Sequence, residues 1–370
     1  MSEITIIGAG GYVGTALSES LILDGYERVR AVVRAYRSLA GLARFGSQVS
    51  IRVADAEHPD ELREAIRGSS VVVNVTTGAP KTIIRSTAAI LDACVREKVR
   101  RLVHLSSAVV FGEARSPSLT DDSPPLRKHW MPYARAKAAS ERFLRNLLES
   151  SPIEIAVLRP GIVWGPRSPH TRDIVESLLD KRAFLVDEGK GVFNGIYIDN
   201  LIYSIQACIN DKVDIRGFYN VADQERVTWR EFYSQLATSL DYDMARIVHV
   251  SSRHFPWSRR AAIDYLQALP GVNQLYHRLK SHVPAGVKAS LKARLSGCVT
   301  YERPVPSYQS SPYVSRELWH LQRTCYKLPT TKFARRFDLA VPVSFGEGVL
   351  RTLAWLSHIG LTARETCCAT

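Results

Sequence analysis

A glycine-rich turn near the start of the chain constrains its fold more than any other feature. The segment 4–7 (ITII) is a short apolar run typical of a buried strand, the segment 8–14 (GAGGYVG) follows it, and a helical pattern begins at about Thr15. Glycine permits a tight turn and lets the backbone approach phosphate groups closely. The N-terminus of the following helix offers free N–H groups and a positive dipole end. The turn therefore predicts a dinucleotide site between a strand and a helix.

The rest of the first 160 residues repeats this alternation of strands and helices. Apolar runs predict further strands, helical patterns separate them, and the runs are continuous rather than alternating, which is typical of strands covered on both faces. The strands are predicted at 30–34, 49–55, 71–75, 101–105 and 153–158, and the helices at 59–68 and 81–98. The sequence thus predicts an α/β fold with a doubly wound, Rossmann-like parallel sheet over residues 1–165.

From about residue 165 the regularity loosens, and we expect a smaller C-terminal substrate-binding region over 166–370 that shares strands and helices with the first part. Short elements are predicted at 172–179, 195–198, 200–209, 217–221, 228–240, 330–337 and 344–356. Residues 250–310 lack this rhythm and are interrupted by prolines. We interpret them as a basic helical insertion.

Tyr133 and Lys137 stand four residues apart in a helical segment, so one helical face would carry both. A phenol beside an ammonium group is an arrangement suited to proton transfer at a carbonyl or an alcohol. The alternative is an ordinary solvated pair, which is common on helices. Ser107, at the end of the fifth predicted strand, favours the first interpretation.

Five motifs in register resemble those of the extended short-chain dehydrogenase/reductase family, which includes the NAD-dependent epimerases and dehydratases. Gly8, Gly11 and Gly14 match its GxxGxxG fingerprint, and Tyr133 and Lys137 match its YxxxK pair. The segments 106–112 (SSAVVFG), 158–166 (LRPGIVWGP) and 197–201 (YIDNL) are similar to later motifs of the family. The resemblance covers about residues 1–240 and returns weakly at 326–356.

The resemblance implies roles for three residues. Tyr133 would exchange a proton with the substrate oxygen while a hydride moves to or from the nicotinamide. Ser107 would hydrogen-bond the same oxygen, although a serine that satisfies a backbone group is the alternative. Lys137 would hold the nicotinamide ribose and, with the oxidised ring, lower the pKa of the phenol from its ordinary value of about 10.

The end of the second predicted strand bears on the cofactor. NAD-binding members of the family usually carry an acid there, whereas this chain has Arg34 and Arg37, which favour the 2′-phosphate of NADP over NAD. The alternative is that Arg34 stacks on adenine or faces solvent. Asp55 and Ala56 would lie near the adenine. The remaining predicted cofactor-binding residues are Gly8, Gly11, Tyr12, Val13, Gly14, Val75, Thr76, Lys137, Pro160 and Val163.

Departures from the family pattern limit the reaction. Dehydratases of this family place an Asp–Glu pair directly after the catalytic Ser/Thr, but this chain has Ala108 and Val109, so 4,6-dehydration is disfavoured. The first hypothesis is an NAD(P)-dependent oxidoreductase or epimerase acting on a sugar-like substrate, nucleotide- or lipid-linked. A hydroxysteroid- or dihydroflavonol-type NADPH-dependent carbonyl reductase is the alternative. A non-catalytic dinucleotide sensor is the second alternative.

The charge distribution bears on partners. The chain carries a net charge of +13, and residues 251–300 hold eight Lys/Arg against one acid, Asp264. This segment would either meet a membrane surface peripherally, through 250–300, or form a basic lid over the substrate. No nucleic-acid-binding motif and no metal-ligand spacing is present, and the scattered cysteines suit a cytoplasmic setting. The resemblance implies a homodimer packed through the helix of Tyr133.

Overall fold

A seven-stranded parallel sheet forms the centre of the computed structural model, which describes residues 3–112, 118–257, 262, 265, 314–338 and 341–361. The strand order is β10-β6-β5-β4-β1-β2-β3. The strands are β1 (Ile4–Ile7), β2 (Val29–Val33), β3 (Val49–Val53), β4 (Val71–Asn74), β5 (Arg101–Leu105), β6 (Glu154–Pro160) and β10 (Gly217–Val221). The strand order reverses at β1: β2 and β3 lie on one side of it, and β4, β5 and β6 lie on the other. In such folds ligands bind at the carboxyl ends of the strands where the order reverses, here β1 and β4.

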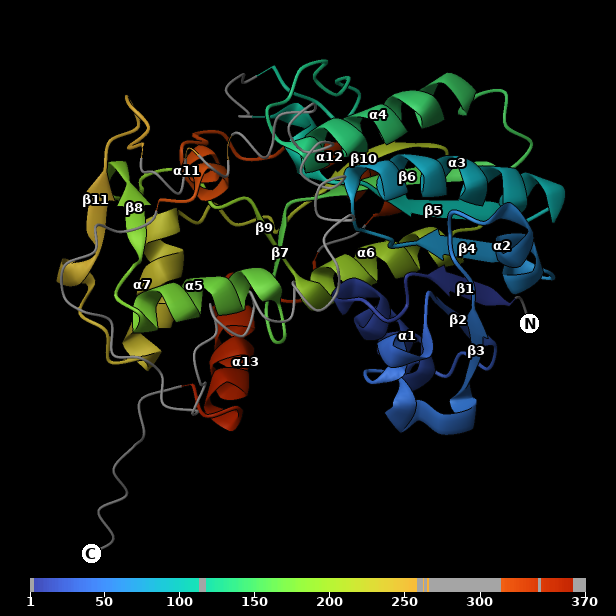
Figure 1. Ribbon diagram of the computed structural model, residues 1–370, viewed down its shortest axis with the longest axis horizontal. Helices are drawn as coiled ribbons and strands as arrows, with labels where there is room; N and C mark the ends of the chain where they lie inside the picture. The colour runs from blue at the N-terminus through green and yellow to red at the C-terminus, as the bar shows by residue number, and fades with distance from the viewer. Residues whose placement is uncertain are drawn as a thin grey trace, which may run out of the picture.

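Helices cover both faces of this sheet (Figure 1). On one side lie α1 (Tyr12–Leu23) and α6 (Ile198–Asn210), and on the other α2 (Pro59–Ile66), α3 (Pro80–Arg96) and α4 (Pro132–Leu147). Successive residues of a strand contribute to the hydrophobic cores on opposite faces of the sheet: Ile6 packs in one cluster and Ile7 in the other. The predicted doubly wound sheet is therefore confirmed.

A second lobe lies beside the carboxyl ends of the strands (Figure 1). It contains α5 (Pro169–Leu179), α7 (Trp229–Ser239), α11 (Arg316–Gln322), α13 (Phe345–His358), and the paired strands β8 (Phe184–Val186) and β11 (Val248–Val250). The strands β7 (Ile162–Trp164) and β9 (Gly195–Tyr197) join the lobes, and α12 (Thr331–Phe337) packs against β10. Trp164 lies at the centre of an aromatic cluster and donates a hydrogen bond to Asp223 (2.8 Å).

The observed elements differ from the prediction in a few places. Strand β6 runs through Pro160, two residues beyond its predicted end, because a proline at the last position of a strand costs at most one ladder bond. Helix α11 and strands β7, β8 and β11 were not predicted, since each is too short to show a clear periodicity. The boundary at residue 165 stays a prediction, and β10, beyond it, belongs to the main sheet.

The basic insertion predicted at 250–310 lies outside the described residues, apart from 250–257, 262 and 265. Among the helices of the described part, none combines the length and the apolar character that crossing a membrane requires.

Candidate active site

The glycine turn has the shape that a dinucleotide pyrophosphate needs. Gly8 has φ +90°, a conformation that side-chain-bearing residues rarely adopt. A Cβ on Gly14 would lie 2.4 Å from the carbonyl oxygen of Gly8, so only glycine lets α1 pack this closely on the turn. Gly11 precedes the first residue of α1, whose leading N–H groups have no partners within the helix. The residues present therefore fit a dinucleotide whose phosphates rest on this helix end.

A cavity of about 440 Å³ opens beside this turn, at the carboxyl ends of the central strands. The structure brings together in its lining most of the residues that the sequence singled out. These are Gly11, Tyr12, Val13, Val75, Thr76, Ser107, Tyr133, Lys137, Pro160 and Val163. Their convergence from five different parts of the chain is a property of the fold rather than of local sequence.

The predicted contacts for the adenosine end lie outside this cavity. Arg34 and Arg37 follow β2 and are exposed, and among the described residues neither has an ion-pair partner. The carboxylate of Asp55 accepts a hydrogen bond from the N–H of Glu57 (3.0 Å). Gly8 and Gly14 shape the turn, and Ala56 lies next to Asp55. The cofactor roles of these residues remain predictions.

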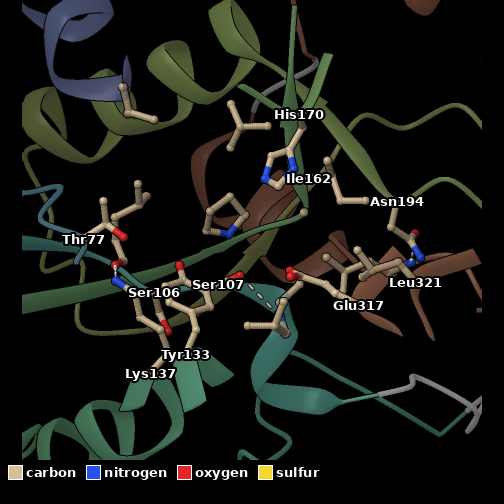
Figure 2. A pocket seen from close by; sticks show the side chains of 18 of the residues that line it. Thr77, Ser106, Ser107, Tyr133, Lys137, Ile162, His170, Asn194, Glu317 and Leu321 are labelled. Carbon is tan, nitrogen blue, oxygen red and sulfur yellow. Dashed lines mark hydrogen bonds between the residues drawn. The ribbon is translucent and has the colours of Figure 1, made fainter. Parts of the chain in front are cut away.

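Ser107, Tyr133 and Lys137 lie together on one side of the cavity (Figure 2). The Ser107 hydroxyl oxygen accepts a hydrogen bond from the N–H of Val109 (3.4 Å). Lys137 is 3% exposed, and its ammonium donates to the carbonyl of Leu105 (2.8 Å). The Lys137 nitrogen lies 6.0 Å from the centroid of the Tyr133 ring. The hydroxyl, phenol and ammonium groups that proton transfer requires thus share one wall.

The pKa values of this wall differ from the expectation drawn from the sequence. Burial, followed by the charge of Glu317, raises the pKa of Tyr133 to about 12, and hydrogen bonds with Ser107 and Thr77 offset only part of this. Burial lowers the pKa of Lys137 to about 8. In the protein by itself the phenol pKa is thus raised, and its lowering by Lys137 together with the oxidised nicotinamide stays a prediction. A phenol that is neutral at pH 7 can donate a proton at that pH, but it must be deprotonated before it can accept one.

A buried ion pair fixes the helix that carries Tyr133 and Lys137. Glu141, two turns beyond Tyr133, and Arg159 of β6 are both fully buried and paired at 2.6 Å. The Ser106 hydroxyl donates to the same carboxylate (2.5 Å), and Arg159 also donates to the carbonyl of Asp121 (2.7 Å). This network joins α4, the end of β5 and β6 behind Ser107, Tyr133 and Lys137. It holds Ser107, the neighbour of Ser106, in a fixed place.

The opposite side of the cavity carries residues that the sequence analysis missed. Glu317 of α11 and His170 of α5 point into the cavity, as do Asn194 and Leu321 (Figure 2). Thr77, also missed, lies on the side of Tyr133 and Lys137 (Figure 2). Asn194 is already engaged, since its side chain accepts from Leu328 and donates to Tyr326. A capping serine, Ser315, is the sequence signal for α11, but it gives no sign of where that helix packs.

The Glu317 side chain is exposed, although protein surrounds its carboxyl group. Its side chain reaches the void of the cavity and is accessible there, yet protein atoms surround the carboxyl group. This burial raises the pKa of Glu317, and His170 partly offsets the rise. Within the described residues the carboxylate has no hydrogen-bond or ion-pair partner of its own. It is therefore available to a bound molecule.

Comparisons with known proteins agree with this architecture. A family model, the NAD dependent epimerase/dehydratase family, matches residues 4–222. The chain is 27% identical over 224 residues to the 2-alkyl-3-oxoalkanoate reductase of Shewanella oneidensis, covering 55% of this chain and 56% of that enzyme. It is 26% identical to a decarboxylating sterol-4-alpha-carboxylate 3-dehydrogenase of Dictyostelium discoideum, covering 63% and 75% of the two chains. The chain thus spans only about half the length of the first of these relatives.

Solved structures share the fold at low identity. The dTDP-glucose 4,6-dehydratase of Streptomyces venezuelae superposes with a TM-score of 0.68 at 19% identity, covering 96% of this chain and 97% of that one. The UDP-glucose 4-epimerase of Thermotoga maritima gives 0.66 at 16% identity, covering 96% and 99%. At such identities the likeness establishes the architecture alone. Helix α11, with Glu317, lies beyond the residues that the family model matches.

Proposed function

We propose, because this chain belongs to the NAD dependent epimerase/dehydratase family, that it interconverts a secondary alcohol and a carbonyl with a nicotinamide dinucleotide. The observation that carries the proposal is the meeting of Ser107, Tyr133 and Lys137 in one cavity beside the glycine turn. When bound, the nicotinamide supplies or accepts the hydride at the substrate carbon.

The protein's own residues handle the oxygen and the proton. Tyr133 donates its phenolic proton to the carbonyl oxygen during reduction and takes it back during oxidation. Ser107 hydrogen-bonds the same oxygen and fixes its position. Lys137 holds the ribose. Because burial keeps the phenol neutral at pH 7, the resting site is ready for carbonyl reduction.

The lining of the cavity favours a substrate with an apolar body. Among the described lining residues the charged side chains are Lys137 and Glu317, with no arginine. A nucleoside diphosphate would bring negative charge toward the Glu317 carboxylate, near which the described lining offers the imidazole of His170 but no arginine. The hydroxysteroid- or dihydroflavonol-type carbonyl reductase therefore has more support than the sugar-like substrate. Relatives named for a 2-alkyl-3-oxoalkanoate and a sterol carboxylate support the same choice.

Two finer points belong to the proposal. Ala108 and Val109 line the cavity and carry no group that transfers protons, which supports the prediction against 4,6-dehydration. The exposed Arg34 and Arg37 support a preference for NADP. Replacing Arg34 by Asp would weaken NADPH binding at least tenfold and leave NADH binding nearly unchanged. Equal losses for both cofactors, measured by calorimetry, would remove the preference.

A small panel of substrates tests the function. Purified protein is given NADPH or NADH with ethyl 2-methylacetoacetate or a 3-ketosteroid, and cofactor oxidation is followed. In a parallel assay it is given NADP+ or NAD+ with UDP-glucose, and UDP-galactose formation is followed. We expect NADPH oxidation with the apolar ketones. Conversion of UDP-glucose without net cofactor consumption would establish an epimerase instead, and tight cofactor binding without any turnover would favour the sensor.

Location and assembly are also proposed. We expect a cytoplasmic protein and a homodimer formed through α4, which sedimentation velocity would detect. We also propose a peripheral membrane contact through 250–300, which is largely outside the described residues. Pelleting with anionic liposomes tests it, and loss of pelleting on deletion of 255–300 is the expected result.

A further inference from the structure

A second cavity of about 280 Å³, the annex, adjoins the catalytic cavity. The two share one wall, formed by Val109 and Gly112 on one side and Glu317, Leu321 and Thr324 on the other. The first pair belongs to the turn that follows Ser107, and the other three belong to α11 and its end. The passage between the cavities therefore runs between the catalytic segment and α11.

The annex has a mainly apolar interior. Leu126, Trp130, Met131 and Ala134 contribute to its lining, and it lies beside the first turn of α4, directly next to Tyr133. Its polar lining residues are Lys128, His129, Glu317, His320 and Thr324. The Nε2 of His129 is buried and has no hydrogen-bond partner among the described residues. Burial lowers the pKa of His129, so the ring is neutral at pH 7. The annex thus offers a hydrocarbon moiety the apolar surface of Leu126, Trp130, Met131 and Ala134.

The side chains between the two cavities are not tightly enclosed by protein. Glu317 is open to the void, and Leu321 is half-buried. Trp130 stacks on the guanidinium of Arg316 (4.8 Å), the residue before Glu317, so an aromatic–cation contact ties the annex to α11. A chain leaving the catalytic centre past Glu317 would reach the apolar side chains of Trp130 and Met131.

We propose that the annex binds the distal, apolar arm of the substrate whose carbonyl group lies at Tyr133. The occupant follows from continuity, because five of the residues that line the annex also line the catalytic cavity. The substrates are then carbonyl compounds with an alkyl or ring extension longer than the catalytic cavity holds. This inference rests on the proposed carbonyl chemistry, but its binding test does not require turnover.

The test uses a series of methyl ketones from 2-hexanone to 2-dodecanone, titrated into the full-length protein by calorimetry with NADP+ present. Each methylene that enters the annex lowers the Kd about fourfold. Leu126→Trp fills the annex from its half-exposed rim. We expect it to abolish this gain while leaving 2-hexanone binding unchanged. The matched control, Leu350→Trp, adds the same ring to an exposed leucine of α13, and we expect it to keep the gain.

A spectroscopic readout guards against a variant that merely misfolds. The bromine of 12-bromododecan-2-one quenches tryptophan on contact, so it would dim Trp130 in the native chain, whereas 6-bromohexan-2-one would not reach it. Trp130→Phe would lose this quenching. Equal quenching in that variant, a flat chain-length series, or absence of ketone binding would overturn the annex proposal. Length-dependent binding without NADPH oxidation would refute the proposed function alone, and oxidation with a flat series would refute the annex alone.

Discussion

The two walls of the catalytic cavity are built in opposite ways. The α4 wall, formed by Tyr133, Lys137 and the residues behind them, is buried and internally paired: Arg159 and Glu141 are fully buried, and Lys137 is 3% exposed. The α11 wall, formed by Glu317, Leu321 and Thr324, is more open: Glu317 is exposed and Leu321 half-buried, while Thr324 is buried. The family model matches the residues of the first wall and ends before the second.

This difference indicates that the α4 wall would carry out proton transfer and the α11 wall would recognise the substrate. Proton transfer needs groups held within a narrow range of positions, and buried ion pairs on several elements hold them there before any substrate arrives. Recognition of a particular substrate needs a surface that can change without disturbing those groups. A short helix with an unpaired carboxylate, far along the chain, provides such a surface. We therefore expect changes on the α4 wall to abolish activity or folding, and changes on the α11 wall to alter which reaction conditions or substrates are favoured.

The largest expected effect tests the α4 wall directly. Tyr133→Phe removes the only hydroxyl proposed to exchange a proton with the substrate, and turnover would fall about 10²- to 10⁴-fold. The melting temperature and the Kd for NADPH would change little, because the ring is kept. Tyr36→Phe, at an exposed tyrosine after β2, is the control. Full turnover by the Tyr133 variant would remove Tyr133 from the mechanism.

The buried pair behind the site is the next test. Arg159→Met leaves the fully buried Glu141 carboxylate without its partner, which costs about 3–5 kcal/mol in the free energy of unfolding. Arg351→Met breaks the half-exposed pair with Glu347 and costs about 0–1 kcal/mol. Urea denaturation measures both. Similar losses in the two variants would show that the α4 wall is not held as the geometry indicates.

The sequence predicted the α4 wall well because its signals are local. The glycine turn and the spacing of Tyr133 and Lys137 each depend on a few neighbouring residues. Continuous apolar runs likewise predicted all seven strands of the main sheet to within two residues at each end.

The α11 wall could not be predicted in this way. Glu317 meets Tyr133 only because a helix from late in the chain folds back over the cavity, and no periodicity in seven residues reports that contact. The raised pKa of Tyr133 could not be foreseen for the same reason, because its largest cause is the burial of the phenol in the folded protein. Tertiary packing determines both features.

Lys137 offers a smaller effect with a definite dependence on pH. Burial lowers its folded-state pKa to about 8 from an ordinary 10.5. Between these values the unfolded chain binds a proton that the folded chain does not, so native stability falls as pH drops through this window and the full penalty remains below pH 8. Lys137→Met would abolish activity yet raise the free energy of unfolding at pH 7 by about 1–2 kcal/mol, after the lost hydrogen bond to Leu105 is counted.

The stabilisation by Lys137→Met should shrink toward pH 10, where the lysine is neutral in the folded protein and has begun to lose its proton in the unfolded chain. Lys81→Met, at an exposed lysine of α3, would show no such dependence. Urea titrations at pH 7 and pH 10 decide it. A destabilised Lys137 variant at pH 7 would mean that the buried ammonium is better compensated than its contacts with Leu105 and Thr76 indicate.

The smallest effect tests whether the α11 wall influences the chemistry at all. The Glu317 carboxylate raises the pKa of Tyr133, so Glu317→Gln would lower that pKa by less than about one unit. Alcohol oxidation requires the phenolate form of Tyr133. The small fraction of phenolate at pH 9 would rise about two- to tenfold, and the rate of alcohol oxidation would rise by the same factor. Glu347→Gln, on the exposed face of α13, is the control. An unchanged rate would confine Glu317 to substrate recognition, whereas a loss of stability comparable to that of Arg159→Met would show that the α11 wall is as tightly built as the α4 wall.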